Sequence, residues 1–251
     1  MSDARSHEAS PTAPRADVIP VPAVPRVDVR GGGRFPVHRI YCVGRNFADH
    51  AREMGAQAPA SRESRGRPVF FSKPADALVL DGRVPYPPAT SELHHEVELV
   101  VAIGRDAGPG VLAASDAPGL VFGYAIGLDL TRRDLQAQAK AGGLPWDIAK
   151  GFDHSAPVGE LVRAADAGPL EPRTLSLQVN GQHRQSSRLD QLIWSVDEIL
   201  HELSQLYRLR AGDLVFMGTP AGVAALQPGD RCSARLDDLL SLDCVILPPL
   251  S

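Results

Sequence analysis

Two glutamates, Glu96 and Glu98, lead into the apolar run Leu99–Ile103 and are the residues best suited to chemistry. An extended strand alternates its side chains, so both carboxylates point to the same side at the edge of a buried segment. They cannot both stay ionised there unless a positive charge lies between them. Oxygen ligands favour Mg²⁺ or Mn²⁺ over zinc. The alternative is a solvated strand end whose glutamates face water.

A third acid, Asp129, ends another apolar run directly before a predicted helix. It could merely support the N-terminus of that helix. With Glu96 and Glu98 it would complete a three-carboxylate face that leaves positions for water and substrate, as a catalytic Mg²⁺ site requires. His95 points away from this face by strand alternation, and His94 needs no ligand role once Asp129 completes the set. We therefore expect an oxygen-only site.

A histidine–glutamate pair, His50 and Glu53, lies on a helix predicted over Phe47–Met54. Residues three apart share a helix face, so Glu53 can orient the imidazole and raise its basicity. Such a pair suits a general base that takes a proton from water. The alternative is an exposed surface pair with no chemical role. The short connection from the preceding strand favours a helix that becomes ordered when ligand binds.

Several other polar residues follow buried segments. Arg133 and Gln136 share one face of a helix predicted over Arg132–Ala141. Lys150 and Lys73 each adjoin an apolar stretch, and burying either would require an anionic partner. The alternative for each lysine is a position that faces solvent.

Gly218-Thr219-Pro220 forms a predicted tight turn after a buried strand. It could present backbone N–H groups and a hydroxyl to a carboxylate, or it could be only a turn.

The elements that must position these groups are mostly strands. A helix begins at a capping box, Ser195-x-x-Glu198, and runs to about Tyr207, while Thr131 is expected to cap the helix that starts at Arg132. Asn180-Gly181 predicts a hairpin. Many strands, few helices and no regular alternation indicate a β-rich, mixed α+β fold. Strands are expected at Ile40–Val43, Val69–Phe71, from Glu96 onward, at Val121–Leu130, Leu175–Val179, Leu214–Met217, Cys232–Leu236 and Leu242–Leu247.

Differences in composition separate two N-terminal segments from the rest of the chain. Residues 1–17 are rich in Ser, Ala, Pro and charge and are expected to be disordered. Residues 18–37 read as an extended arm with edge-strand prolines and a break at Gly31–Gly33. Residues 38–251 form the remaining domain, in which Gln57–Arg67 is expected to be a mobile polar loop.

The overall composition excludes some classes of function. A formal net charge of −4 and a pI near 6.1 argue against a nucleic-acid or anionic-membrane binder. No apolar run reaches the length of a membrane span, and the N-terminus lacks the layout of a secretory signal. Cys42, Cys232 and Cys244 have no metal-type or redox-type spacing, so we expect small core residues in a reducing cytoplasm.

Taken together, these motifs resemble the fumarylacetoacetate hydrolase family from about Ile40 to the C-terminus. The resemblance implies a β-roll core with a few flanking helices, a homodimer and an Mg²⁺ or Mn²⁺ site in a catalytic domain that spans residues 38–251. The motifs that carry it are Val43-Gly44-Arg45-Asn46-Phe47-Ala48-Asp49-His50, Leu93-His94-His95-Glu96-Val97-Glu98-Leu99, Gly127-Leu128-Asp129-Leu130-Thr131-Arg132-Arg133-Asp134, Leu144-Pro145-Trp146-Asp147-Ile148-Ala149-Lys150 and Gly218-Thr219-Pro220-Ala221-Gly222-Val223.

The resemblance also implies a role for each candidate residue. The metal ligands correspond to Glu96, Glu98 and Asp129, and the dyad on a lid helix corresponds to His50 and Glu53. A basic group such as Lys73 or Arg52 is expected to meet a distal substrate carboxylate. Positions that contact substrate or stabilise charge correspond to Arg133, Gln136, Lys150 and Thr219.

Within the family, the chain looks most like bacterial fumarylpyruvate hydrolases, which cleave a C–C bond to give fumarate and pyruvate in gentisate breakdown. The rivals are an acylpyruvase or oxaloacetate decarboxylase, an isomerase or decarboxylase of the homoprotocatechuate route, and a binding module without turnover. The His50–Glu53 dyad favours hydrolysis, because decarboxylation needs no water nucleophile. One departure is the segment Leu236–Ser241, which lacks the family's usual turn glycine.

Overall fold

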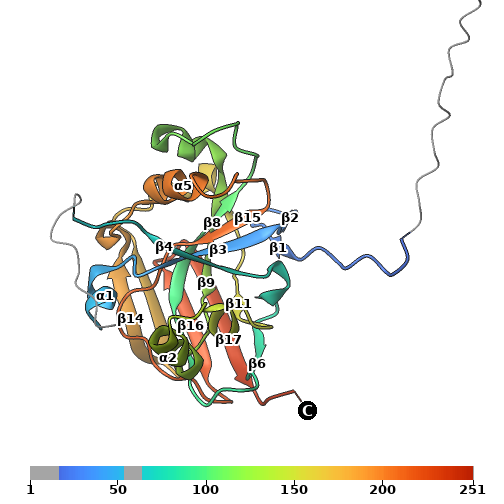
Figure 1. Cartoon of the computed structure of the whole chain (residues 1–251), viewed down its shortest axis with the longest axis vertical. Helices are drawn as coiled ribbons and strands as arrows, with labels where there is room; N and C mark the ends of the chain where they lie inside the picture. Colours follow the sequence, from blue (N-terminus) through green and yellow to red (C-terminus); the bar gives the residue numbers. More distant parts are fainter. Residues whose placement is uncertain (1–16, 54–63, 251) are drawn as a thin grey trace, which may run out of the picture.

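The computed structural model describes residues 17–53 and 64–250, which fold around two β-sheets (Figure 1). The six-stranded sheet has the order β12 (Val162–Arg163), β9 (Val121–Leu128), β8 (Val97–Ile103), β15 (Asp213–Phe216), β3 (Arg39–Gly44) and β4 (Val69–Lys73). The five-stranded sheet has the order β14 (Gln182–Arg188), β13 (Thr174–Val179), β16 (Arg231–Leu236), β17 (Leu240–Leu247) and β6 (Arg83–Pro85).

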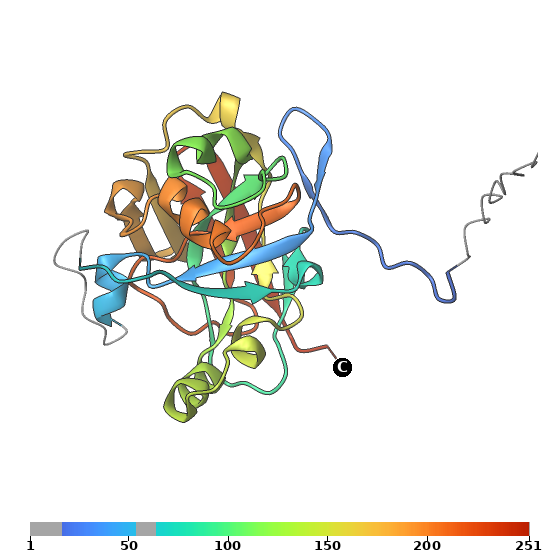
Figure 2. The ribbon, with the colours of Figure 1, turned by 45° about the horizontal axis from the view of Figure 1, so that its top comes forward.

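Short strand pairs and short helices surround the sheets. The pairs are β1 (Arg26–Asp28) with β2 (Arg34–Pro36), β7 (Leu93–His94) with β10 (Thr131–Arg132), and β5 (Leu78–Val79) with β11 (Ala156–Pro157). The α-helices are α1 (Ala48–Glu53), α2 (Arg133–Gly142), α3 (Asp147–Lys150), α4 (Ala164–Ala167) and α5 (Val196–Ser204), and 3₁₀ turns cover Ala75–Ala77, Ala114–Leu120 and Leu189–Gln191. In Figure 2, α2 lies at the lower end of the molecule, away from α5. No helix among the described residues is long and apolar enough to span a bilayer.

Strand β8 is central and buried along its whole length. Its odd-numbered residues, such as Leu99 and Val101, pack into a large core shared with the five-stranded sheet and α5. Its even-numbered residues, Val100 and Ala102, pack into a second core on the opposite face. Glu98 has the parity of this second face, which is why the strand delivers a carboxylate to a site beside the second core.

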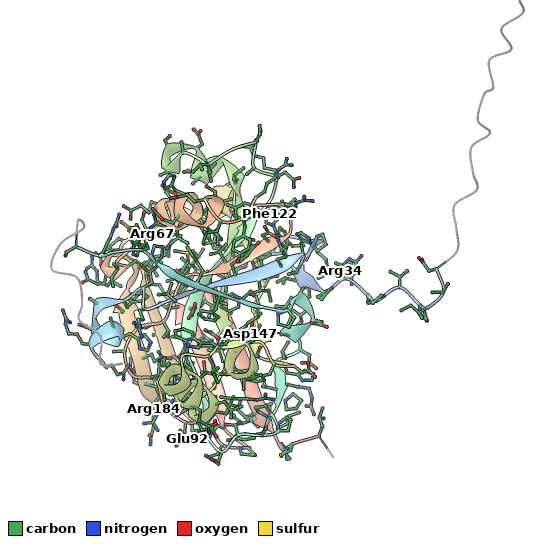
Figure 3. All side chains as sticks on the ribbon, in the orientation of Figure 1. Arg34, Arg67, Glu92, Phe122, Asp147 and Arg184 are labelled. Atoms are coloured by element: carbon green, nitrogen blue, oxygen red, sulfur yellow. The ribbon has the colours of Figure 1, made fainter. Side chains whose placement is uncertain are left out.

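The β1–β2 hairpin covers part of that second core. Its buried residues Val27 and Phe35 pack there, and Arg34, labelled in Figure 3, marks the side from which residues 17–25 extend outward. The glycine break expected at Gly31–Gly33 is the turn of this hairpin. The expected disordered tail, apart from residue 17, and residues 57–63 of the expected mobile loop lie outside the described residues.

Most of the elements expected from the sequence are confirmed, and the α+β class with them. The capping box at Ser195 forms, although its helix ends at Ser204 rather than near Tyr207. The predicted Thr131 cap is wrong. Thr131 pairs with His94 in a short ladder, and the N-cap position of α2 is Arg132, which makes no side-chain capping hydrogen bond among the described residues.

The turn that lacks the expected glycine nevertheless forms between β16 and β17. Asp237 takes the left-handed backbone conformation there, with a φ of 44°. Aspartate tolerates this region better than most residues. The local turn geometry is therefore preserved without glycine.

Gly127 pairs with Glu98 in the β8–β9 ladder, where a side chain has no room. A Cβ there would lie 2.5 Å from the Phe216 ring. We expect Gly127→Ala to lower the free energy of unfolding by about 1–3 kcal/mol through overpacking. Gly108→Ala is the matched control, because nothing lies within 4 Å of its added Cβ. Urea unfolding midpoints measure both variants, and equal stability would contradict the packing argument.

Candidate metal and acid–base site

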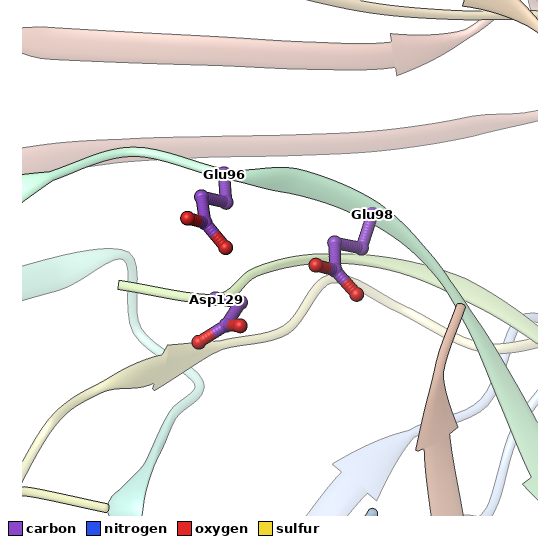
Figure 4. Close-up of side chains that lie close together, drawn as sticks. All are labelled: Glu96, Glu98 and Asp129. Carbon is purple, nitrogen blue, oxygen red and sulfur yellow. The ribbon is translucent and has the colours of Figure 1, made fainter. Parts of the chain in front are cut away.

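Three carboxylates meet where strands β8 and β9 come together (Figure 4). The backbone N–H of Asp129 donates to the Glu96 carbonyl at 2.8 Å, which continues the β8–β9 ladder beyond its last paired residues. Glu98 lies two residues further along and points to the same side. Carboxylate oxygens of all three residues lie within 4.8 Å of one another, and all three side chains are buried.

Three cations balance these acids. Lys150 Nζ donates to Glu96 Oε2 at 2.7 Å and to Asp129 Oδ2 at 2.6 Å. Lys73 Nζ lies 2.9 Å from Asp129 Oδ1, and Arg133 contacts Glu96 through Nη2. Both lysines are almost fully buried. Each has the anionic partner that a buried lysine was predicted to need.

The two glutamates differ in their protonation. Burial by itself would raise the pKa of Glu96, but the charges of Lys150 and Arg133 outweigh it and hold that pKa below its usual value. Glu98 has no such contact. Burial raises its pKa well above the usual value, and the negative charges of Asp129 and Glu96 raise it further. The charge of Lys150 and a hydrogen bond from the Gly218 N–H oppose this shift but do not cancel it.

The donor set fits a hard divalent cation. Three oxygen ligands converge from one side, and Glu98 remains without a cationic partner, so an added positive charge would relieve the repulsion on it. The nearby histidines stay outside this set. His95 Nδ1 is 2.8 Å from Gln185 Oε1, and the pKa of His94 is lowered to about 4 by burial and by Arg133. Within the described residues, the metal-type cluster contains only carboxylates.

Helix α1 brings a histidine over the same pocket. His50 is buried and lines it, and its Nδ1 lies 3.1 Å from Glu53 Oε2. Because a carboxylate only accepts, Nδ1 carries the proton and Nε2 of the neutral ring is free to take one. The Gly222 N–H donates to both Glu53 oxygens, at 3.0 and 3.2 Å, and so fixes the dyad against the turn after β15.

Helix α2 forms another wall of the pocket. Arg133 Nη1 donates to Gln136 Oε1 at 2.6 Å, and both residues line the cavity. The space that the lining residues enclose is about 370 Å³ when the part open to solvent is included.

Thr219 also lines the pocket, but its hydroxyl is already engaged. Its Oγ1 donates to the Val97 carbonyl at 2.9 Å and accepts from Gln185 Nε2 at 2.8 Å. The donor capacity expected for a substrate oxygen is therefore used inside the protein.

The expected distal contacts, Lys73 and Arg52, do not lie on the pocket. Lys73 is behind Asp129, where it also donates to the backbone carbonyls of Leu130 and Lys150. Arg52 is exposed on the other side of α1, where it contacts Asp49. The expectation that either one meets a substrate carboxylate does not fit these positions.

Three residues of the site were not assigned a role by the sequence. Gln185, on β14, ties His95, Thr219 and the strand start together through one buried amide, and no local pattern marks it. Arg45 and Lys140 line the pocket. A signal for Lys140 was present, since it follows Gln136 by four residues on the same helix face.

Comparison with known proteins gives a consistent family signal. Residues 39–247 match the family model described as fumarylacetoacetate (FAA) hydrolase C-terminal. A fumarylpyruvate hydrolase from Ralstonia sp is 42% identical over 193 residues, which cover 73% of this chain and 98% of the relative. A mitochondrial oxaloacetate tautomerase from Caenorhabditis elegans is 37% identical over 211 residues, 84% of this chain and 95% of the relative.

A crystal structure of fumarylpyruvate hydrolase from Pseudomonas aeruginosa, in complex with Mn²⁺ and pyruvate, is also similar to this chain. The two share 43% sequence identity and a TM-score of 0.86, over 93% of this chain and 100% of the other. The presence of Mn²⁺ in that relative agrees with the carboxylate donor set described above.

The raised pKa of Glu98 predicts that metal binding displaces a proton. Above the usual carboxyl pKa near 4.5 and below the raised one, folded Glu98 stays protonated while unfolded Glu98 does not, so metal-free stability falls as pH rises. Titration of Mn²⁺ at about pH 6 in buffers of different ionisation enthalpy should show net release of protons on binding. Glu98→Gln should abolish that release. Equal proton release by the variant would contradict the assignment.

Proposed function

The chain belongs to the fumarylacetoacetate hydrolase family, and we propose that it hydrolyses a C–C bond of a 2,4-diketo acid, with fumarylpyruvate as substrate and fumarate and pyruvate as products. One observation carries the proposal. A histidine oriented by a carboxylate faces the same pocket as three convergent carboxylates. This arrangement combines a base for water with a site for a divalent cation.

His50 performs the proton transfers in this proposal. Its Nε2 takes a proton from water, the resulting hydroxide adds to the C4 carbonyl, and the C3–C4 bond then breaks with its electron pair going to C3. The proton on Nε2 is available to return to C3, which completes pyruvate. Glu53 holds the ring through Nδ1, and Gly222 holds Glu53, so the base keeps one tautomer and one orientation.

Glu96, Glu98 and Asp129 would hold Mg²⁺ or Mn²⁺, which supplies a Lewis acid for the keto-acid oxygens of the substrate. Lys150 stays cationic beside them: burial lowers its pKa, but the charges of Asp129 and Glu96 outweigh this and raise it. Negative charge that develops on the substrate therefore meets a fixed positive charge held inside the protein, where it is screened less than in water. Arg133 and Gln136 bind substrate oxygens from α2.

A second candidate is oxaloacetate tautomerisation or decarboxylation, which the similarity to the C. elegans tautomerase supports. That chemistry moves protons or carbon dioxide and needs no water nucleophile. The buried, doubly anchored dyad favours hydrolysis over decarboxylation, which needs no activated water.

The proposal also includes a metabolic pathway, a cellular location and an oligomeric state. We include a place in gentisate breakdown, because the Ralstonia and Pseudomonas relatives are fumarylpyruvate hydrolases. Cytoplasmic location is supported by three free, buried cysteines. A homodimer remains an inference from the family.

The proposed function predicts that fumarylpyruvate is turned over and that EDTA abolishes the activity. His50→Ala should lower the rate of fumarylpyruvate hydrolysis by about 100-fold or more, because it removes the base. Oxaloacetate decarboxylation by the same variant should change by less than about threefold, because it needs no activated water. His183→Ala is the control, since His183 is exposed on β14 away from the pocket. Equal losses on both substrates would contradict a water-activating role, and faster turnover of oxaloacetate than of fumarylpyruvate by the unmodified protein would favour the second candidate.

A further inference from the structure

Two cations, Arg45 and Lys140, line the pocket without being needed by its carboxylates. Lys73, Lys150 and Arg133 already contact Asp129 and Glu96. Across residues 17–53 and 64–250, neither Arg45 nor Lys140 has an ion pair or a side-chain hydrogen bond. The pocket therefore presents two cations, Arg45 and Lys140, that form no ion pair with an acid of the described residues.

Lys140 lies at the far end of the α2 wall. Arg133, Gln136 and Lys140 follow one another at intervals of three and four residues, so they share the helix face that lines the pocket. A rise of 1.5 Å per residue separates Arg133 from Lys140 by roughly 10 Å along the axis. Because Arg133 contacts Glu96, it marks the carboxylate end, and Lys140 marks the opposite end.

Arg45 reaches the pocket from β3 by an unusual backbone. Its φ is 62°, a left-handed conformation that costs a non-glycine residue free energy and is found at functional sites. The next residue, Asn46, is fully buried and bonds Met217 and Trp194, which anchors the turn. The sharp turn thus sends Asn46 into the protein and leaves Arg45 on the pocket.

The surroundings of Lys140 orient its ammonium group but do not neutralise its charge. Its Nζ lies 5.3 Å from the centre of the Trp146 ring, which fixes its direction without neutralising it. Burial lowers the pKa of Lys140, and repulsion from Arg133 and Arg45 lowers it further. The charge of Glu96 raises the pKa of Lys140, but Glu96 is already engaged by Lys150 and Arg133.

We propose that Arg45 and Lys140 form a subsite for the distal carboxylate of a dicarboxylic acylpyruvate, and that they select such a substrate over one that ends in a neutral alkyl group. The inference rests on the proposed function for the placement of the keto-acid end at Glu96, Glu98 and Asp129. The α2 face supplies the length, and the two unpaired cations supply the charge. An acylpyruvate that ends in a methyl group would give neither cation an anionic partner.

The test compares two acids that differ by one carboxylate, fumarate and crotonate. With Mn²⁺ and saturating pyruvate present, calorimetry should show that the unmodified protein binds fumarate more tightly. Arg45→Gln and Lys140→Gln should each weaken fumarate binding about tenfold, and the double variant more, while crotonate binding changes by less than about twofold. The kcat/KM for fumarylpyruvate should fall in parallel, and that for acetylpyruvate should not.

Arg52→Gln is the matched control, because it removes the same charge from the other side of α1. Thermal melts and Mn²⁺ titration establish that each variant is folded and metal-competent. A loss of fumarate binding in Arg52→Gln, equal losses for fumarate and crotonate, or unchanged fumarate binding in the double variant would each overturn the subsite. If the unmodified protein binds both acids as expected but does not hydrolyse fumarylpyruvate, the proposed function fails and the subsite stands.

Discussion

The repulsion between three buried carboxylates is the constraint on which the site depends. Glu96, Glu98 and Asp129 cannot share one dry pocket as anions unless positive charge surrounds them. Lys150 and Lys73 are buried for this reason, because each would be costly inside the protein without its acidic partner. Among the described residues, Glu98 is the member of this group that forms no ion pair, so the pocket can accept one more cation beside it.

The sheet and the helices divide the chemistry between them. Strand β8 is buried throughout and pairs with β9 along its length, so the sheet holds the carboxylates in place. Helices α1 and α2 also line the pocket and carry groups proposed to act on substrate, His50 on one and Arg133 on the other. The hydrogen bond from the Gly222 N–H to Glu53 ties α1 to the turn after β15. It thereby fixes the position of the His50 base relative to the metal site.

The alternation of side chains along a strand and the free-energy cost of burying a charge were enough to predict the centre of the site from the sequence. Glu96 and Glu98 share a face because a strand has a period of two, and Lys150 needed an acid because its surroundings are apolar. Positions that depend on contacts distant in the chain were not accessible. Thr131 was misassigned because its pairing with His94 overrides a local capping preference, and Lys73 is hidden behind Asp129 by the packing of β4. The direction of Arg45 depends on a left-handed turn that its residue type does not signal.

Anomalous diffraction from crystals grown with Mn²⁺ tests the central claim most directly, because it locates the ion without reference to activity. The charge balance predicts one strong peak among Glu96, Glu98 and Asp129, with one oxygen of each at roughly 2.1 Å, the length typical of Mg²⁺–oxygen bonds. Lys150 Nζ should then remain beside Glu96 or Asp129 as the balancing charge. A principal peak at His94 or His95, or no peak among the three carboxylates, would contradict the account.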